Sequence, residues 1–233
     1  MAASCHVCPF RGSCIVAGVE RAGLDKFSGA LLRYPVRGKG RSVFNQGESN
    51  NAFVFLCNGV VKTVKNLPDG SDVILEVLSP FSVINVPPES DTSRHPFSAV
   101  TISALTELAS IKKEDLFSLL DSFPRMSDNL CGHVSRRFVT SFNMLSAMQL
   151  EVRRRILTVL SFFRGAWKAD DGAGYVSIPL TRGELAQLVQ TTPETISRRL
   201  RQLREEKIVR ISPEAKISVA EAALRDYLNE SPS

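Results

Sequence analysis

The hydrophobic pattern of this 233-residue chain changes its period near Ser122, and that change limits the folds it can adopt. Between residues 25 and 122, short runs rich in β-branched and aromatic residues are separated by turn signals such as Asn58-Gly59 and Pro68-Asp69-Gly70. From Met126 to Met148, apolar residues recur every three or four positions, the spacing of one face of a helix. The sequence therefore predicts an α+β chain in which a β domain precedes a group of helices.

The β segment is expected to form a β-sandwich or roll, because many short strands at close spacing are typical of these folds. Its clearest runs are Ser42-Val43-Phe44, Ala52–Leu56, Val60–Val64 and Val73–Val77. We expect this domain to span residues 21–122 and to follow a separate cysteine-rich segment at residues 1–20.

The apolar stripe that follows covers about six helical turns. It consists of Met126, Leu130, Val134, Phe138, Phe142, Leu145 and Met148. A stripe of this length on a helix between two domains often forms the seam of a dimer. The alternative is a core helix that lies on the β domain. We predict a dimerisation helix at residues 123–150, and hence a homodimer.

The C-terminal region, residues 151–233, carries the signals of two short helices joined by a tight turn. Thr181 can cap the first helix, and Thr192 followed by Pro193 is a typical start for the second. The second helix then turns apolar residues inward: Ile196, Leu200 and Leu203. Two such helices form a helix-turn-helix, whose second helix enters the major groove of DNA. The runs Ile208–Ile211 and Ile217–Val219 predict a two-stranded wing.

The second helix begins with groups that can read bases. An arginine can bond to both O6 and N7 of guanine, a glutamate can accept from N4 of cytosine, and a serine hydroxyl can do either. Arg199, Arg201 and Arg204 are better placed for phosphates, which position a protein without specifying sequence. The candidate DNA-binding residues are Arg182, Thr192, Glu194, Thr195, Ser197, Arg198, Arg199 and Arg201. The alternative is a basic, solvated helix in an ordinary α-helical hairpin.

Through these features, including the segment LTRGELAQLVQTTPETISRRLRQL, nearly the whole chain resembles the CRP/FNR transcription regulators. Residues 194–198 match the E-x-x-S-R pattern of the FNR branch, whereas Pro193 stands where the CRP branch has the first arginine of R-E-x-x-x-R. The resemblance implies a double-stranded β-helix (jelly-roll, cyclic-nucleotide-binding-like) sensor domain and a winged helix-turn-helix. It also implies a dimer on a palindrome of TTGAT-type half-sites, read by Glu194, Ser197 and Arg198, with RNA polymerase as a further partner.

Three of the five cysteines, Cys5, Cys8 and Cys14, lie close together with the spacing C-x2-C-x5-C. In a reducing compartment, clustered thiols more often bind metal or sense redox state than form disulfides. Thiolates suit iron–sulfur clusters and zinc. The same spacing near the N-terminus is similar to that of the oxygen-sensing FNR branch, which implies an oxygen-labile [4Fe-4S] cluster.

A cluster of this kind needs a fourth ligand, and the usual family position falls on Ala109. Cys57 ends a predicted strand that we expect to pair with the strand carrying Ala109. The expected metal ligands are therefore Cys5, Cys8, Cys14 and Cys57. Cys131 is the second candidate, and the weaker ones are His6, Asp128 and His133. Alternatively, Cys57 and Cys131 are small buried apolar residues, as free cysteines usually are.

Other functions fit the sequence less well. The family's cyclic-nucleotide pocket resembles F-G-E-L…R-S-A, but this chain has Pro80–Asn85 there and Phe97 in place of the phosphate-binding arginine, so we expect no cyclic nucleotide. The sequence has no Ser/His/Asp set, carboxylate pair or phosphate-binding glycine loop, which predicts a protein that is not an enzyme. It also has no apolar run near the roughly 18 residues of a membrane span and no secretory signal. We therefore expect a cytoplasmic protein that does not bind membranes.

These expectations combine into one hypothesis, a DNA-binding regulator that responds to oxygen, redox state or nitric oxide through an iron–sulfur cluster. The cluster would control dimerisation and so the spacing of two recognition helices. The open alternatives are regulators of the same type that use zinc, a reversible disulfide, haem or another small ligand instead.

Overall fold

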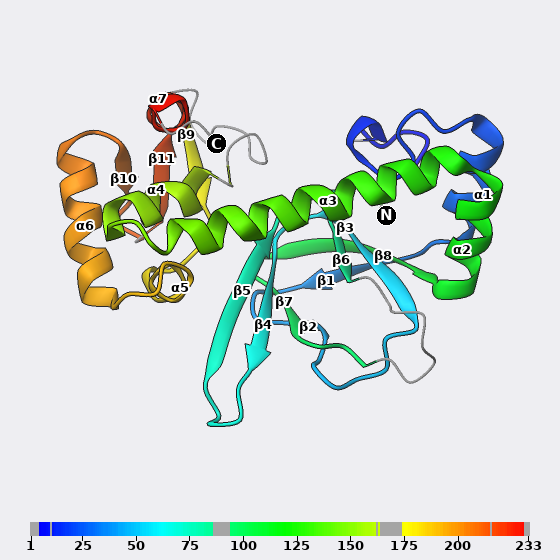
Figure 1. Cartoon of the computed structure of the whole chain (residues 1–233), viewed down its shortest axis with the longest axis horizontal. Helices are drawn as coiled ribbons and strands as arrows, with labels where there is room; N and C mark the ends of the chain where they lie inside the picture. The colour runs from blue at the N-terminus through cyan, green and yellow to red at the C-terminus, as the bar shows by residue number, and fades with distance from the viewer. Residues whose placement is uncertain are drawn as a thin grey trace. The chain divides into compact units, whose positions relative to one another are not determined.

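The computed structural model describes residues 5–9, 11–85, 94–161, 163, 174–214 and 216–230. The chain forms two compact units, Met1–Val139 and Thr140–Ser233. A single helix, α3 (Pro124–Ala147), begins in the first unit and ends in the second (Figure 1). The α+β class and the predicted order of a β domain, a long helix and a helical C-terminal region are confirmed.

The strands described in the first unit form two four-stranded antiparallel sheets. One sheet has the order β1 (Leu32–Arg37), β8 (Leu105–Lys112), β3 (Ala52–Asn58) and β6 (Val83–Asn85). The other has the order β2 (Ser42–Phe44), β7 (Ser98–Thr101), β4 (Val61–Asn66) and β5 (Asp72–Leu78). Apart from the consecutive pair β4 and β5, neighbouring strands in each sheet come from distant parts of the sequence, as expected for a jelly-roll rather than a meander.

Strand β3 is buried on both faces, and this explains its nearly continuous apolar sequence. Val54 and Leu56 belong to a core shared with strands of the other sheet, where they pack with residues such as Phe44 and Val61. Phe53 and Phe55 belong to a second core on the opposite face. Cys57 lies at an irregularity in the register of β3 and β8, between Leu56 and Asn58, and packs against the same core as Phe55.

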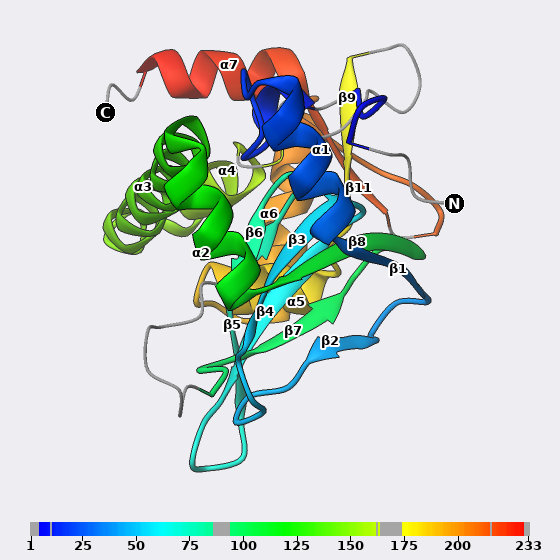
Figure 2. The ribbon, with the colours of Figure 1, turned by 90° about the vertical axis from the view of Figure 1, so that its right-hand side faces the viewer.

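Helices cover that second face of the β1-β8-β3-β6 sheet (Figure 2). They are α1 (Arg21–Ala30), α2 (Lys113–Ser122) and the first turns of α3. Leu24 and Phe27 of α1 and Leu116 of α2 are at most 4% exposed there. Helix α1 lies inside the segment expected to be mainly β. Its apolar residues meet the sheet only in the folded chain, and the run is too short for a clear periodic signal.

The second unit contains α4 (Val152–Ser161), α5 (Arg182–Leu188), α6 (Pro193–Glu205) and α7 (Glu221–Glu230). Its sheet has the order β10 (Val209–Ile211), β11 (Ile217–Ala220) and β9 (Tyr175–Ile178). The predicted two-stranded wing therefore has a third strand, β9, whose Val176 and Ile178 are buried. Four residues of alternating burial give too weak a pattern to identify a strand from sequence alone.

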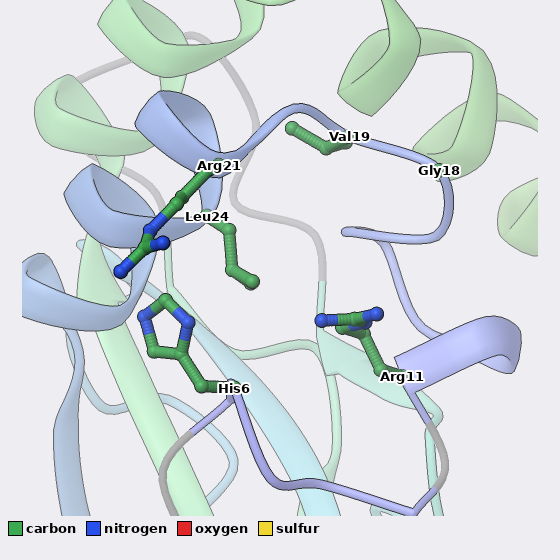
Figure 3. A pocket seen from close by; sticks show the side chains of 6 residues that line it. All are labelled: His6, Arg11, Gly18, Val19, Arg21 and Leu24. Carbon is green, nitrogen blue, oxygen red and sulfur yellow. The ribbon is translucent and has the colours of Figure 1, made fainter.

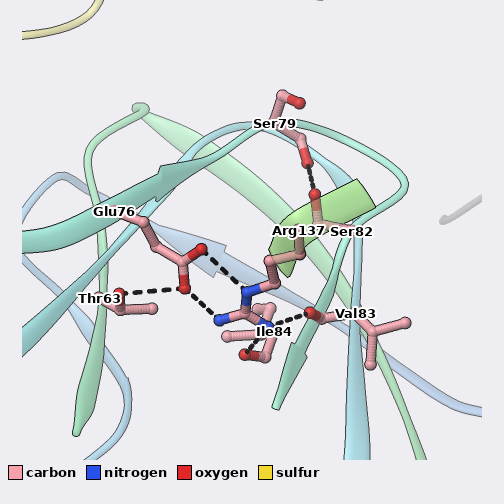
Figure 4. Close-up of polar contacts among 7 residues, drawn as sticks. All are labelled: Thr63, Glu76, Ser79, Ser82, Val83, Ile84 and Arg137. Carbon is pink, nitrogen blue, oxygen red and sulfur yellow. Dashed lines mark hydrogen bonds and ion pairs between the residues drawn. The ribbon is translucent and has the colours of Figure 1, made fainter. Parts of the chain in front are cut away.

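Within the first unit, Arg137 attaches α3 to the strands (Figure 4). Its guanidinium donates to both carboxylate oxygens of Glu76 in β5, with Nε 2.9 Å from Oε2. The Nη1 atom donates to the carbonyls of Val83 and Ile84 at 2.9 and 3.0 Å. The Thr63 hydroxyl donates to the same carboxylate at 3.4 Å. Because the arginine and glutamate side chains are only 27% and 24% exposed, this bidentate pair is shielded better than a surface ion pair.

Replacing Glu76 by alanine is expected to lower the free energy of unfolding by about 2 kcal/mol, because it leaves a partly buried guanidinium without its carboxylate. Urea unfolding followed by circular dichroism measures the change. Arg136→Ala, at the exposed neighbouring position of α3, is the matched control and is expected to change stability by less than about 0.5 kcal/mol. Equal stability of the two variants would contradict the stabilising role of the Arg137–Glu76 pair.

Candidate metal centre and DNA-contacting helix

The cysteine-bearing segment folds into short turns that end in a buried anchor. The backbone N–H of Arg11 donates to the carbonyl of Cys8, and that of Cys14 donates to the carbonyl of Arg11, both at 3.2 Å. The next two residues, Ile15 and Val16, are 1% and 2% exposed in the core beneath the helices. The turns bring the three cysteines close together, and the anchor fixes the segment against the sheet.

The structure brings the four expected metal ligands to one pocket of about 260 Å3. Its wall includes Cys5, Cys8, Cys14 and Cys57. Ala109 lines the same pocket, and it lies in β8 directly opposite Phe55 of β3. The expected pairing between the strand of Cys57 and the strand of Ala109 is therefore confirmed. Among the residues that the structure describes, no three Cys, His, Asp or Glu side chains are grouped as ligands of a single metal ion.

The remaining ligand candidates lie elsewhere. Cys131 is exposed on α3 and is not part of the pocket wall. His6 faces a separate, open hollow of about 510 Å3, where it lies beside Leu24 and Arg21 of α1 and across from Arg11 (Figure 3). Its Nε2 is 2.8 Å from a carboxylate oxygen of Asp25. Neither Asp128 nor His133 contributes to the cysteine pocket.

The pocket disfavours the thiolate form of two of its cysteines, Cys57 and Cys14. Burial and the neighbouring Cys14 and Cys5 thiols together raise the pKa of Cys57 to about 12, and the charge of Arg33 opposes this rise. Burial also raises the pKa of Cys14. Without metal, these two thiols are therefore protonated at neutral pH. Any metal that binds here must displace protons, as is usual for thiolate ligands.

Two groups at the pocket carry no signal in the sequence. Arg33 of β1 donates from Nη2 to the Cys5 sulfur at 2.8 Å, and the Glu107 side chain of β8 also forms part of the wall. Both lie in strands that reach the pocket only through pairing with distant segments. Local sequence around either residue gives no reason to connect it with the cysteines.

The two helices of the second unit begin as the sequence predicts. Thr181 forms a capping box with Glu184 at the start of α5. At the start of α6, the Thr192 hydroxyl accepts from the backbone N–H of Thr195, and Pro193 occupies the first turn. The predicted inward residues of α6 are all buried: Ile196, Leu200 and Leu203.

The opposite side of α6 carries the three candidate base-reading residues, Glu194, Ser197 and Arg198, together with Arg201, a candidate phosphate contact. Glu194, Arg198 and Arg201 are exposed, and Ser197 is half-buried. Hydrogen bonds from its own backbone N–H and from Thr192 lower the pKa of Glu194, so its carboxylate is charged and accepts at neutral pH. These residues are three or four positions apart, so they share one face of the helix.

The other candidates differ in how freely they reach solvent. Thr192 and Thr195 use their hydroxyls in the helix cap, where the two oxygens are 3.2 Å apart. Arg199 is half-buried and donates from Nη1 to Gln202 at 2.9 Å. Arg182 is exposed at the start of α5.

Comparison with known proteins identifies both units. Residues 37–123 match the family described as "Cyclic nucleotide-binding domain", and residues 154–227 match the "Crp-like helix-turn-helix domain". The chain belongs to the CRP/FNR family of DNA-binding transcription regulators. Members with this pair of domains are regulators, so the protein is not an enzyme.

Individual relatives agree with this assignment. The "Cyclic AMP receptor protein" of Thermus thermophilus is 29% identical over 192 residues, which cover 82% of this chain and 85% of the relative. The "Transcriptional activatory protein AadR" of Rhodopseudomonas palustris is 23% identical over 209 residues, covering 89% of this chain and 85% of AadR. The solved structure of FixK2 from Bradyrhizobium japonicum, at 19% identity, has a TM-score of 0.71 over 84% of this chain and 96% of FixK2, which shows a common fold.

In the described part of this CRP/FNR chain, no helix is long and apolar enough to cross a bilayer.

The geometry predicts an order of thiol alkylation in the metal-free protein. Iodoacetamide attacks the thiolate, so the exposed Cys131 is expected to react first and Cys57, with its raised pKa and partial burial, at least tenfold more slowly at pH 8. Timed alkylation followed by peptide mass spectrometry measures each rate. Equal rates at the two cysteines in the folded chain would contradict the placement of Cys57 in the pocket. Urea-unfolded protein is the control, in which the two rates are expected to become similar.

Proposed function

We propose that this CRP/FNR regulator responds to oxygen, nitric oxide or redox state through a [4Fe-4S] cluster held by Cys5, Cys8, Cys14 and Cys57. One observation carries the proposal, namely that a cysteine from the β domain lines the same pocket as the three N-terminal cysteines. Its subtype within the family would then be FNR-like, as the E-x-x-S-R pattern of α6 also suggests.

The donor set and the pocket wall suit such a cluster. Four soft sulfur donors face a pocket of about 260 Å3. Apolar side chains line much of the wall: Val16, Phe27, Leu31, Phe55 and Phe81. Such surroundings limit the access of water to bound metal and tune its redox potential. When bound, the cluster supplies one-electron redox chemistry and sensitivity to oxygen.

The position of Cys57 supports its use in place of the usual fourth ligand. Ala109 stands at the family's position and lies opposite Phe55. Cys57 is two residues beyond Phe55 on the same face of β3, and neighbouring strands are only about 4.8 Å apart. A ligand transferred from β8 to β3 therefore reaches the same pocket, and the small Ala109 side chain leaves room for it.

Contacts of the cysteine segment with α3 supply a physical link to dimerisation. The Asn129 side-chain amide donates to the carbonyls of Ile15 and Ala17 at 2.8 and 2.9 Å, just after Cys14. Met126, one turn earlier in α3, is fully buried in the core that also contains Ile15. Ligation of Cys14 would hold this segment in place on α3, and loss of the cluster would release it.

The middle of α3 supplies the surface for a second copy. The apolar stripe is buried at Met126 but largely exposed beyond it, with Val134 at 45%, Phe138 at 63% and Leu145 at 66%. Burying these side chains against their equivalents in a second chain would form a coiled-coil seam. The dimer would present two α6 helices to a palindrome of TTGAT-type half-sites, in the cytoplasm and with RNA polymerase as a partner.

We propose that cyclic nucleotide is not the signal. The name of the Thermus relative includes cyclic AMP, and this chain has a domain of the cyclic nucleotide-binding family. However, Phe97, which stands where we align the phosphate-binding arginine, packs against the core with its ring centre 6.0 Å from that of Phe44.

Anaerobic purification with iron and sulfide assays tests the cluster. The wild-type chain is expected to contain about four irons and four sulfides, to be brown and to bleach in air. Cys57→Ser is expected to lose most of the iron and the oxygen-dependent change in DNA binding, because a fourth soft ligand is gone. The control, Cys131→Ser, removes the other cysteine outside the N-terminal segment and is expected to behave as wild type.

Three outcomes would contradict the proposal. Full iron content in Cys57→Ser would exclude Cys57 as the ligand, and loss of iron in Cys131→Ser would move the site to α3. A colourless wild-type chain that cannot be reconstituted would exclude the cluster, and zinc analysis, thiol titration, haem addition and cyclic AMP binding would then separate the alternatives.

The DNA-contacting face of α6 is tested by binding measurements at fixed salt. Arg198→Ala is expected to weaken binding to a TTGAT-type palindrome about 10- to 100-fold, with little effect on unrelated DNA, because it removes about 1–3 kcal/mol of base discrimination. Arg201→Ala, one turn along the same face, is expected to weaken binding to both DNAs equally and to reduce the salt dependence. A similar loss on both DNAs for Arg198→Ala would make that residue a phosphate contact instead.

A further inference from the structure

Arg33 reaches the cysteine pocket from β1. It lies directly opposite Ala109 of β8, so it is next to the position at which the family's usual ligand is missing. Its Nη2 donates to the Cys5 sulfur at 2.8 Å, and its side chain forms part of the pocket wall. Of the described residues that line this pocket, Arg33 and Arg11 are the cationic ones, and the hydrogen bond to a cysteine sulfur belongs to Arg33.

The guanidinium is held in this orientation by α1. Its Nη1 donates to the Ser28 carbonyl at 3.3 Å, and Nη2 donates to the Ser28 hydroxyl at 3.2 Å. The planar guanidinium can donate to Ser28 and to a sulfur at the same time in a fixed geometry. A lysine ammonium, on a flexible chain, would not hold its donors in fixed directions. The end of α1 therefore fixes a positive charge against the Cys5 sulfur.

We infer that Arg33 is a positioning residue of the metal centre, which orients Cys5 and offsets the negative charge of a thiolate-ligated iron–sulfur cluster. The inference rests on the proposed function. Four thiolates make the ligated cluster an anion, and a one-electron reduction adds a further negative charge in an apolar pocket. A fixed cation beside one sulfur stabilises the reduced form more than the oxidised form and so raises the midpoint potential. Hydrogen bonds to cluster sulfurs act in the same direction.

The charges of the other residues on the pocket wall explain why a cation is needed beside Cys5. Glu107, from the strand that pairs with β1, is an acid on the same wall. Without Arg33, the cluster would face this acid with no cation bonded to a cysteine sulfur.

The experiment compares variants of the full chain purified without oxygen. Arg33→Gln removes the charge, Arg33→Lys keeps the charge without the planar donor geometry, and Arg37→Gln is the control on the exposed part of the same strand. Iron and sulfide content is measured first. Each loaded protein is then titrated with dithionite, which adds one electron per cluster, and the midpoint potential is read from the visible and electron paramagnetic resonance spectra.

Arg33→Gln is expected to lower the midpoint potential by about 59 mV. For one electron, this shifts the ratio of oxidised to reduced cluster at a fixed potential roughly tenfold towards oxidised. Arg33→Lys is expected to show a smaller shift in the same direction, and Arg37→Gln none. If Arg33→Gln does not fold, Ser28→Ala, which removes the hydroxyl that orients the guanidinium, is expected to lower the potential as well.

The outcomes separate the two proposals. A wild-type chain without iron overturns the proposed cluster. A loaded wild-type chain whose potential is unchanged in Arg33→Gln overturns the inference on Arg33 alone and leaves the cluster in place. If Arg33→Gln does not fold, an unchanged potential in both Arg33→Lys and Ser28→Ala also overturns the inference on Arg33.

Discussion

The burial of strand β3 on both faces is the constraint on which the rest of the first unit depends. Val54 and Leu56 pack between the two sheets, while Phe53 and Phe55 pack beneath the helices. This packing holds Cys57, at the irregularity of β3 between Leu56 and Asn58, on the side of the core that contains Phe55. A shift of one residue in the register of β3 would exchange the side chains of its two faces and turn Cys57 away from the N-terminal segment, so the core that stabilises the fold also positions the fourth cysteine.

The same arrangement brings two separate contacts from the pocket region to α3. The segment that follows Cys14 is bonded to Asn129, near the start of the helix. Farther along, Arg137 is bonded to the carbonyl of Val83, and Val83 lies opposite Phe55 of the strand that carries Cys57. A change in the order of the cysteine segment therefore has a short physical connection to the helix. In the proposed function, this connection lets the binding or loss of the cluster shift the equilibrium between monomer and dimer.

Features with a strong local signal could be predicted from the sequence. The Thr192-Pro193 start of α6 and its inward residues are set by capping and by helical spacing, which act within a few residues. The meeting of Cys57 with the other cysteines followed from a resemblance and a strand pairing, which the register of β3 and β8 confirms. The Arg137–Glu76 pair and the Arg33–Cys5 bond were not predicted, because each joins segments far apart in the sequence and depends on the final packing.

Four half-buried thiols gather around one pocket, and at two of them the thiolate is costly unless something binds it. Burial and the neighbouring cysteines raise the pKa of Cys57 to about 12, and they also raise the pKa of Cys14. Cysteine can pack as a small apolar residue, but an apolar role does not require four of them around one pocket or a guanidinium bonded to a sulfur. Iron would replace the thiol protons with positive charge, and Arg33 would offset the excess negative charge that remains. The features that are unfavourable for the free thiols are thus those that a bound cluster would relieve.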